Sequence, residues 1–158
     1  MKNFLKNQLL IMILLALQLS INGQDVIRQV SCADTTQKKE ADSLKAEFSR
    51  KGFIVVKEAA IMMESEYEMP IIVPLTQGSW YQFVFIGDPS SKVIEVRMFD
   101  YNERRVAFVK HYGEDKDGNI ISYPYIPQFT EYHMIKPVQV NKSKNKVCGY
   151  IIMFKRVK

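Results

Sequence analysis

Residues Gly78–Gly87 read GSWYQFVFIG, and this stretch decides the fold. Its apolar residues occupy both alternating faces, Tyr81, Phe83 and Phe85 on one and Trp80, Val84 and Ile86 on the other. Because successive side chains of a strand point to opposite faces, such a strand is predicted to be central and covered on both sides. We interpret its rings as core, leave only Trp80 undecided, and expect its neighbours to be strand 92–100 and the last strand.

The surrounding chain consists of short Val-, Ile-, Tyr- and Phe-rich runs broken by turn residues, which is typical of strands. We predict strands at 53–58, 60–66, 69–75, 79–87, 92–100, 105–111, 119–123, 129–140 and 147–156. No strand–helix alternation is present, so a parallel α/β sheet is not expected. The pattern predicts a mainly β protein, an antiparallel two-sheet β-sandwich that is jelly-roll-like.

One helix is predicted before the strands, over Thr35–Lys51. Asp34 or Thr35 can cap it, and Gly52 supplies a stop. Ala41, Leu44 and Phe48 form a narrow apolar stripe. We expect the helix to lie over one outer face of the sandwich.

The N-terminal residues 1–23 are typical of a signal peptide, with Lys2 and Lys6 before the apolar run Leu9–Leu19. That run is shorter than the roughly 20 residues of a membrane span, although an uncleaved anchor is the alternative. The predicted organisation is a signal peptide at 1–23, an N-terminal segment and helix at 24–52, and a sandwich at 53–158 that forms one domain with the helix. We expect an exported protein, periplasmic or secreted, without a further transmembrane segment.

Charge gives little indication of a partner. The full chain has a net charge of +5, and loss of Lys2 and Lys6 leaves 20 basic against 17 acidic residues, or +3. This modest excess does not call for nucleic acid, so no nucleic-acid partner is expected.

The two cysteines, Cys32 and Cys148, stand near opposite ends of the predicted exported chain. In an oxidising compartment an even pair predicts a disulfide. The alternative is a buried free Cys148 on a strand and an unpaired Cys32.

Several features occur together in an order that resembles a known family. The Gly-led aromatic strand is followed by a strand ending Met98-Phe99-Asp100, and the last strand opens Cys148-Gly149-Tyr150. Over roughly 53–157 this resembles the pre-peptidase C-terminal type of secreted bacterial β-sandwich. The resemblance implies a jelly-roll-like module without catalysis of its own. The chain differs by carrying an N-terminal helix and no peptidase.

Catalytic and metal-binding patterns are poorly supported. A Cys–His enzyme would need Cys148 beside His133, and a disulfide-bonded Cys148 is not a nucleophile. Glu64, Glu66 and Glu68 alternate in a way that is better explained by a solvated face than by paired catalytic carboxylates. We therefore expect no enzyme and no cofactor.

A calcium site is considered at the loop of Asp115, Asp117 and Asn119, where Glu114 could assist. The spacing is like the start of a calcium loop, but the glycine and the closing Glu are not at the offsets of an EF-hand. An ordinary solvated turn is the favoured interpretation, so no metal is expected.

Binding is the better supported class of function. The segment Ile121–His133 contains four aromatic residues and two prolines, and exposed Tyr suits glycan or peptide recognition. Plugging the ends of the sandwich is the alternative role of these rings. The candidate ligand-binding residues are Tyr123, Tyr125, Phe129, Tyr132, Arg104 and Arg105.

Three functional hypotheses follow from these patterns. The leading one is a non-enzymatic binding module for polysaccharide or an envelope protein, with its oligomeric state left open. The alternative is a structural accessory subunit that pairs its strand edges with an envelope assembly. The third is a hydrolase that uses Glu64, Glu66 or His133.

Overall fold

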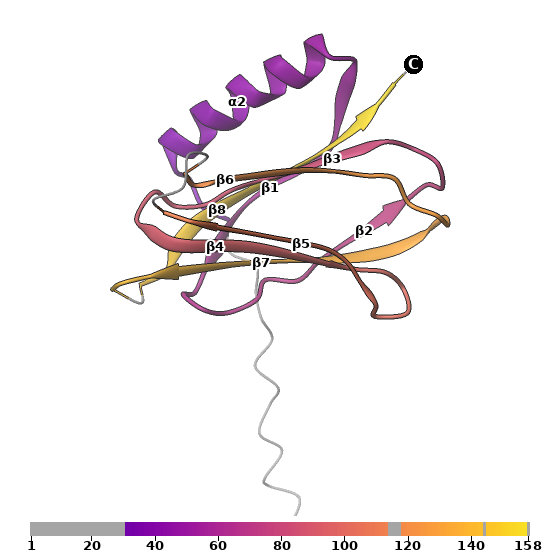
Figure 1. The fold of residues 1–158 in the computed structure, drawn as a ribbon. Coiled ribbons are helices and arrows are strands. Elements are labelled where there is room, and N and C mark those ends of the chain that lie inside the picture. The colour runs from indigo at the N-terminus through magenta and orange to yellow at the C-terminus, as the bar shows by residue number, and fades with distance from the viewer. Residues whose placement is uncertain (1–30, 114–117, 144, 158) are drawn as a thin grey trace, which may run out of the picture.

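The computed structural model describes residues 31–113, 118–143 and 145–157. They form two four-stranded antiparallel sheets stacked face to face, with a helix over one of them (Figure 1). The elements are α2 (Thr35–Arg50), β1 (Phe53–Met63), β2 (Ile71–Leu75), β3 (Tyr81–Ile86), β4 (Ser91–Phe99), β5 (Arg105–Tyr112), β6 (Ile120–Tyr125), β7 (Glu131–Asn141) and β8 (Val147–Arg156). The predicted two-sheet sandwich with one helix before the strands is confirmed.

The order of the strands identifies the architecture. One sheet has the order β1-β8-β3-β6 and the other β2-β7-β4-β5. Most consecutive strands therefore lie in different sheets and are joined across an end of the sandwich. This interleaving of Greek keys is the arrangement of a jelly roll, as the sequence predicted.

Strand β3 is covered on both faces, as its alternation predicts. Tyr81, Phe83 and Phe85 point into the core between the sheets. Val84 and Ile86 point outward into a second apolar cluster under α2. The opposite sheet covers one face of β3 and helix α2 covers the other, which explains why almost every side chain of this strand is apolar.

The predicted neighbours of β3 are half correct. β3 pairs with β8 on one side and with β6 on the other. The predicted partner at 92–100 is β4, which belongs to the opposite sheet. That part of the prediction is wrong because alternation shows which residues face the core but not which of two facing sheets a strand joins.

A second correction concerns β1. The predicted strands 53–58 and 60–66 are one strand, Phe53–Met63, with a register irregularity between Val55 and Lys57. Glu64 and Glu66 follow it in the connection to β2. There Glu66 has a φ of 74°, in the left-handed region, and its backbone N–H donates to Gln139. This backbone conformation cannot continue a strand.

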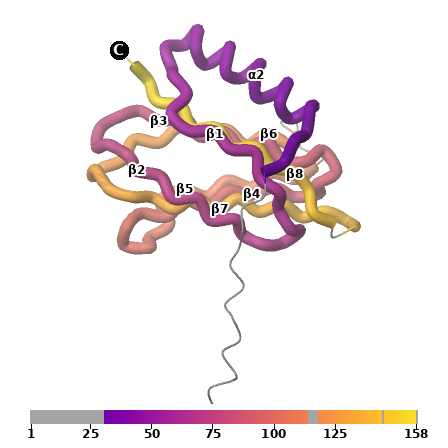
Figure 2. The backbone as a smooth tube through the Cα atoms, turned by 180° about the vertical axis from the view of Figure 1, so that it is seen from behind, coloured from indigo at the N-terminus to yellow at the C-terminus, as the bar shows by residue number. Residues whose placement is uncertain are grey.

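Helix α2 forms where predicted and covers the outer face of the β1-β8-β3-β6 sheet (Figures 1 and 2). The Asp34 side chain accepts hydrogen bonds from the backbone N–H groups of Thr36 and Gln37, each at 2.8 Å. Ala41 and Phe48 are buried against the sheet. Gly52, with a φ of 81°, ends the helix by adopting a conformation that favours glycine.

The predicted disulfide between Cys32 and Cys148 is present, with the two Cα atoms 5.8 Å apart. Beside it, the Nε2 groups of Gln37 and Gln139 both donate to the carbonyl of Cys148, each at 2.9 Å. Gln37 belongs to the helix and Gln139 to the opposite sheet. These bonds therefore tie the start of α2, β8 and β7 together in the interior.

The sequence also predicted a signal peptide at the N-terminus and no further transmembrane segment. The predicted signal peptide, 1–23, lies outside the described residues. Among the described residues, no helix combines the length and the apolar character that crossing a membrane requires.

Candidate ligand-binding site

Three connections meet at one end of the sandwich, which we call the cleft end. They are 76–80 between β2 and β3, 100–104 between β4 and β5, and 126–130 between β6 and β7. Hydrogen bonds hold two of them together, from Gly78 N–H to the Pro127 carbonyl at 3.0 Å and from Gln77 N–H to Thr130 Oγ1 at 3.0 Å. The jelly-roll topology thus brings residues from distant parts of the chain to one surface.

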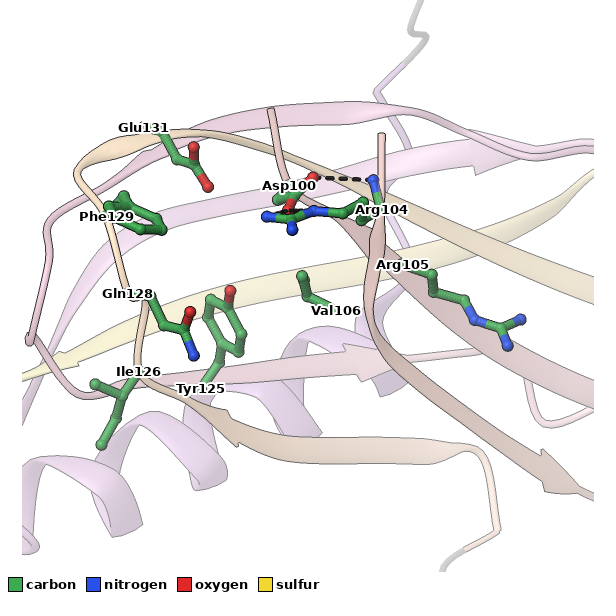
Figure 3. Close-up of a pocket in the computed structure, with 9 residues that line it drawn as sticks. All are labelled: Asp100, Arg104, Arg105, Val106, Tyr125, Ile126, Gln128, Phe129 and Glu131. Carbon is green, nitrogen blue, oxygen red and sulfur yellow. Dashed lines mark hydrogen bonds and ion pairs between the residues drawn. The ribbon is translucent and has the colours of Figure 1, made fainter. Parts of the chain in front are cut away.

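The first hollow at this end has a volume of about 380 Å³. It is lined by Asp100, Arg104, Arg105, Val106, Tyr125, Ile126, Gln128, Phe129 and Glu131 (Figure 3). Four of the six predicted ligand-binding residues are in this set: Tyr125, Phe129, Arg104 and Arg105. The hollow is open to solvent, and much of its lining is polar.

Asp100 fixes the position of Arg104 at one wall. Its Oδ2 accepts from Nε and Nη2 of Arg104, both at 2.8 Å, and its Oδ1 accepts from the backbone N–H groups of Asn102 and Arg104. Burial of Asp100 opposes its ionisation, but the hydrogen bonds and the charge of Arg104 outweigh burial and lower the pKa of Asp100. The carboxylate is therefore ionised at neutral pH, and the mostly exposed guanidinium is held in one orientation.

Tyr125 contributes a hydroxyl group to the lining of the hollow. Its Oη lies 3.0 Å from Nε2 of the buried His133, and Glu131 Oε1 lies 3.7 Å from the same nitrogen. Within the described residues, His133 Nδ1 is buried without a hydrogen-bond partner. Because buried N–H groups are seldom left unpaired, we assign the proton to Nε2, which donates to Tyr125.

With Nε2 of His133 as the donor, the Tyr125 hydroxyl accepts this bond, and its own hydrogen is available for another acceptor. Burial, together with the carboxylates of Glu131 and Asp100, raises the pKa of Tyr125. The phenol therefore stays protonated at neutral pH and acts as a hydrogen-bond donor.

Exposed aromatic rings surround a second hollow of about 460 Å³ at the same end. It is lined by Pro74, Leu75, Tyr101, Thr130, Glu131 and Tyr132. Tyr101 is 72% exposed and Tyr132 is 60% exposed, while Phe129 at the first hollow is 58% exposed. Rings this exposed are available to a ligand.

Two of the predicted residues are placed differently from the rest. Tyr123 lies in the core, stacked on Phe83 with ring centroids 5.4 Å apart, and burial raises its pKa. Arg105 lines the first hollow, but its guanidinium points away from the other lining residues and lies 5.1 Å from the ring centroid of Phe108 (Figure 3).

The sequence did not indicate Gln128 or Glu131, and it indicated Tyr101 only as an aromatic residue near a strand end, outside the list of candidate ligand-binding residues. Gln128 precedes Phe129 in the connection between β6 and β7, and Glu131 is the first residue of β7, so their closeness to Phe129 in the chain is a signal that could have indicated them. Tyr101 follows Asp100 in the connection between β4 and β5. Only the topology shows that this connection meets 126–130.

The other candidates for chemistry are not assembled into a site. Glu64 pairs with Lys146 at 2.8 Å, in the connections at the opposite end from His133. The disulfide occupies Cys148. Geometry therefore does not bring Glu64 or Glu66 to His133, as a shared hydrolytic site would require.

The loop considered as a weak calcium candidate, for which no metal was expected, is described only in part. Asp115 and Asp117 lie outside the described residues. Asn119 Nδ2 donates to the Gly87 carbonyl at 2.8 Å and to Glu40 Oε2 at 3.3 Å. Across the described ranges, no group of three or more His, Cys, Asp or Glu residues could hold a metal ion.

Comparison with known proteins identifies no family for this chain. No protein-family model matches it, so the resemblance to the pre-peptidase C-terminal module stays a prediction. No curated protein matches it either.

Several solved structures are similar at low sequence identity. A carbohydrate-binding module described as CBM4 is 13% identical, with a TM-score of 0.41 over 67% of this chain and 79% of that chain. TmCBM61, solved in complex with β-1,4-galactotriose, is 14% identical, with a TM-score of 0.39 over 69% and 84%. A protein of the disulfide-linked pili of Bacillus endospore appendages is 8% identical, with a TM-score of 0.42 over 67% and 88%. At 8–14% identity these likenesses do not indicate what this chain binds.

Proposed function

We propose that the protein is an exported, non-enzymatic binding module that recognises a carbohydrate at the cleft end. The observation that carries this proposal is an exposed ring, Phe129, at the rim of an open hollow whose lining also includes Gln128, Glu131 and Arg104. Amide, carboxylate and guanidinium groups are planar and present paired hydrogen-bonding atoms.

This combination of groups matches the chemistry of a sugar ring. A sugar presents hydroxyls around its edge and C–H groups on its faces. The ring of Phe129 offers a flat apolar surface for such a face. The Tyr125 hydroxyl and the free N–H groups of Arg104 donate hydrogen bonds, while Glu131 accepts them. A hydroxyl-rich ligand therefore satisfies donors and acceptors that an apolar ligand would leave unpaired.

The same lining is less suited to a protein partner. The centre of a protein–protein interface is depleted of charged residues. The first hollow has Asp100, Arg104 and Glu131 in its lining. Of the two partners expected from the sequence, polysaccharide or envelope protein, the hollow thus favours polysaccharide.

A role without catalysis agrees with the state of Asp100. A glycosidase uses one carboxylic acid that is protonated and one carboxylate. Asp100 is held ionised by Arg104, with its pKa lowered. The hollow therefore offers Asp100 as a positioning group for Arg104 rather than as a proton donor.

Export is proposed from two features together. The first 23 residues are typical of a signal peptide, and the disulfide joins Cys32 to Cys148. Disulfides of this kind persist in oxidising compartments such as the periplasm and the cell exterior.

The alternative role, a structural accessory subunit, depends on the edge of β1. Ile54, Val55 and Val56 are exposed there, which favours pairing with another chain. The irregularity after Val55 and the exposed Lys57 oppose it, because bulges and lysines are devices that protect edges. The cleft end therefore supports the binding role better than the β1 edge supports assembly.

The test is binding of the protein, purified from residue 24 onward, to a panel of immobilised neutral and acidic polysaccharides. We expect retention by at least one polysaccharide, and we expect Phe129→Ala to weaken it about tenfold, the effect of removing about 1.4 kcal/mol of contact. Tyr67→Ala is the matched control, because Tyr67 is an aromatic residue 69% exposed in the connection between β1 and β2. Failure to bind any member of the panel would refute the proposed function.

A further inference from the structure

We infer that the ligand is an oligosaccharide chain spanning two subsites, one in each hollow of the cleft end, rather than a single sugar. This inference rests on the proposed function and deepens it. The observation that carries it is that Glu131 lines both hollows. The two hollows therefore adjoin on one surface.

The walls of the two hollows are continuous along the chain at two further points. Asp100 lines the first hollow, and the next residue, Tyr101, lines the second. In the facing connection, Phe129 lines the first hollow and Thr130 the second. A ligand leaving one hollow past Glu131 thus enters the other without leaving the protein surface.

The two hollows offer different chemistry. The first combines the Phe129 ring with the polar groups of Arg104, Gln128 and Glu131. The second is formed largely by Tyr101, Tyr132 and Pro74, and its surface is mainly apolar. We therefore assign recognition of particular hydroxyls to the first subsite and stacking of a neighbouring sugar to the second.

Glu131 is placed to serve both subsites. Its side chain is only partly exposed, and its Oε1 lies near His133 Nε2 at 3.7 Å. In the described residues the carboxylate has no closer ion pair, so its oxygens remain able to accept hydroxyls from either side. A sugar chain crossing this point keeps the carboxylate hydrogen-bonded while its rings rest on the aromatic groups.

This assignment predicts that affinity depends on chain length. A second subsite adds contact area without a second loss of translational freedom, so each added sugar that reaches it tightens binding. Stacking on the tyrosines of the second hollow should therefore raise affinity about tenfold between one sugar unit and four. Further units extend past the hollows and should add little.

The experiment measures dissociation constants by calorimetry for gluco-, galacto-, xylo- and N-acetylglucosamine oligosaccharides of one, two, four and six units. The proteins are the wild type, the double variant Tyr101→Ala/Tyr132→Ala, Phe129→Ala and the control Tyr67→Ala. All four substituted rings are largely exposed, so the variants should fold. A thermal unfolding curve for each variant checks this.

The expected result has two parts. For wild type and Tyr67→Ala, the tetrasaccharide of the bound series should bind about tenfold more tightly than its monosaccharide. The double variant should lose this difference while keeping the monosaccharide affinity, and Phe129→Ala should weaken binding at every length.

Two other outcomes are possible, and they refute different claims: the second subsite alone, or the proposed function together with it. Equal affinity for all lengths, or an unchanged length dependence in the double variant, refutes the second subsite and leaves the proposed function standing. If no oligosaccharide of the panel binds, the proposed function fails, and the two-subsite inference fails with it.

Discussion

At the scale of single residues, the cleft end is defined by how its polar groups are held. Asp100 orients Arg104, and His133 orients the phenol of Tyr125. Both orienting groups are buried, while Arg104 extends into solvent. A ligand therefore meets donors whose directions are already set, which reduces the entropy lost on binding.

The pair of Asp100 and Arg104 predicts a dependence on pH. The pKa of Asp100 is lowered in the folded protein. A lowered pKa contributes stability that is present above the ordinary Asp pKa of 3.8 and is lost as the pH falls through the folded-state value. Asp100→Asn should therefore lower the urea midpoint at pH 7, and the difference from wild type should shrink as the pH falls below 3.8.

The asparagine variant is chosen because its Oδ1 can still accept from the N–H groups of Asn102 and Arg104. It removes the charge while retaining the turn. A difference between variant and wild type that stays constant from pH 7 to about pH 2 would show that the charge of Asp100 contributes nothing.

At the scale of elements, the sequence predicts the type of each segment better than it predicts which segments pair with one another. The two-sided apolar pattern of Tyr81–Ile86 correctly predicts a covered strand, and the Asp34 cap correctly places α2. The pairing of β3 with β6 could not be predicted from the sequence. Strands pair through backbone groups that every strand presents, so the side-chain pattern does not identify the neighbour. For the same reason the meeting of 100–104 with 126–130 required the topology.

For the candidate site as well, the sequence indicated local features but not how the fold places them. Phe129 and Tyr132 were predicted from local density of rings, and both are exposed. Tyr123 belongs to the same segment, yet it is one of the alternate residues of β6 that face the core. The predicted strand 119–123 ends at Tyr123, so this ring was placed at a strand end, whereas it lies inside the longer strand β6, Ile120–Tyr125.

The disulfide provides a prediction at this scale. It joins residues 116 apart in sequence and fixes the chain before α2 to β8. A loop of this length restricts the unfolded chain strongly, so the double variant Cys32→Ala/Cys148→Ala should lose about 2–5 kcal/mol of unfolding free energy. Urea unfolding measures this loss, and reduced wild type should behave like the variant. A variant as stable as oxidised wild type would contradict it.

At the scale of the whole molecule, the two ends of the sandwich differ in what they present. The cleft end gathers Tyr101, Phe129 and Tyr132 around two hollows. The opposite end contains the connection with Glu64, where Glu64 pairs with Lys146. Helix α2 covers one sheet face and does not cover the cleft end (Figure 1).

Binding at the cleft end is best tested by chemical-shift mapping of the isotope-labelled protein, titrated with the tightest-binding oligosaccharide. We expect the largest shift changes to fall within 100–106 and 125–132, together with Pro74 and Leu75. Residues 64–67 and 145–147 at the opposite end should stay unchanged. Changes concentrated at that opposite end, or on α2, would contradict the assignment of the cleft end as the binding site.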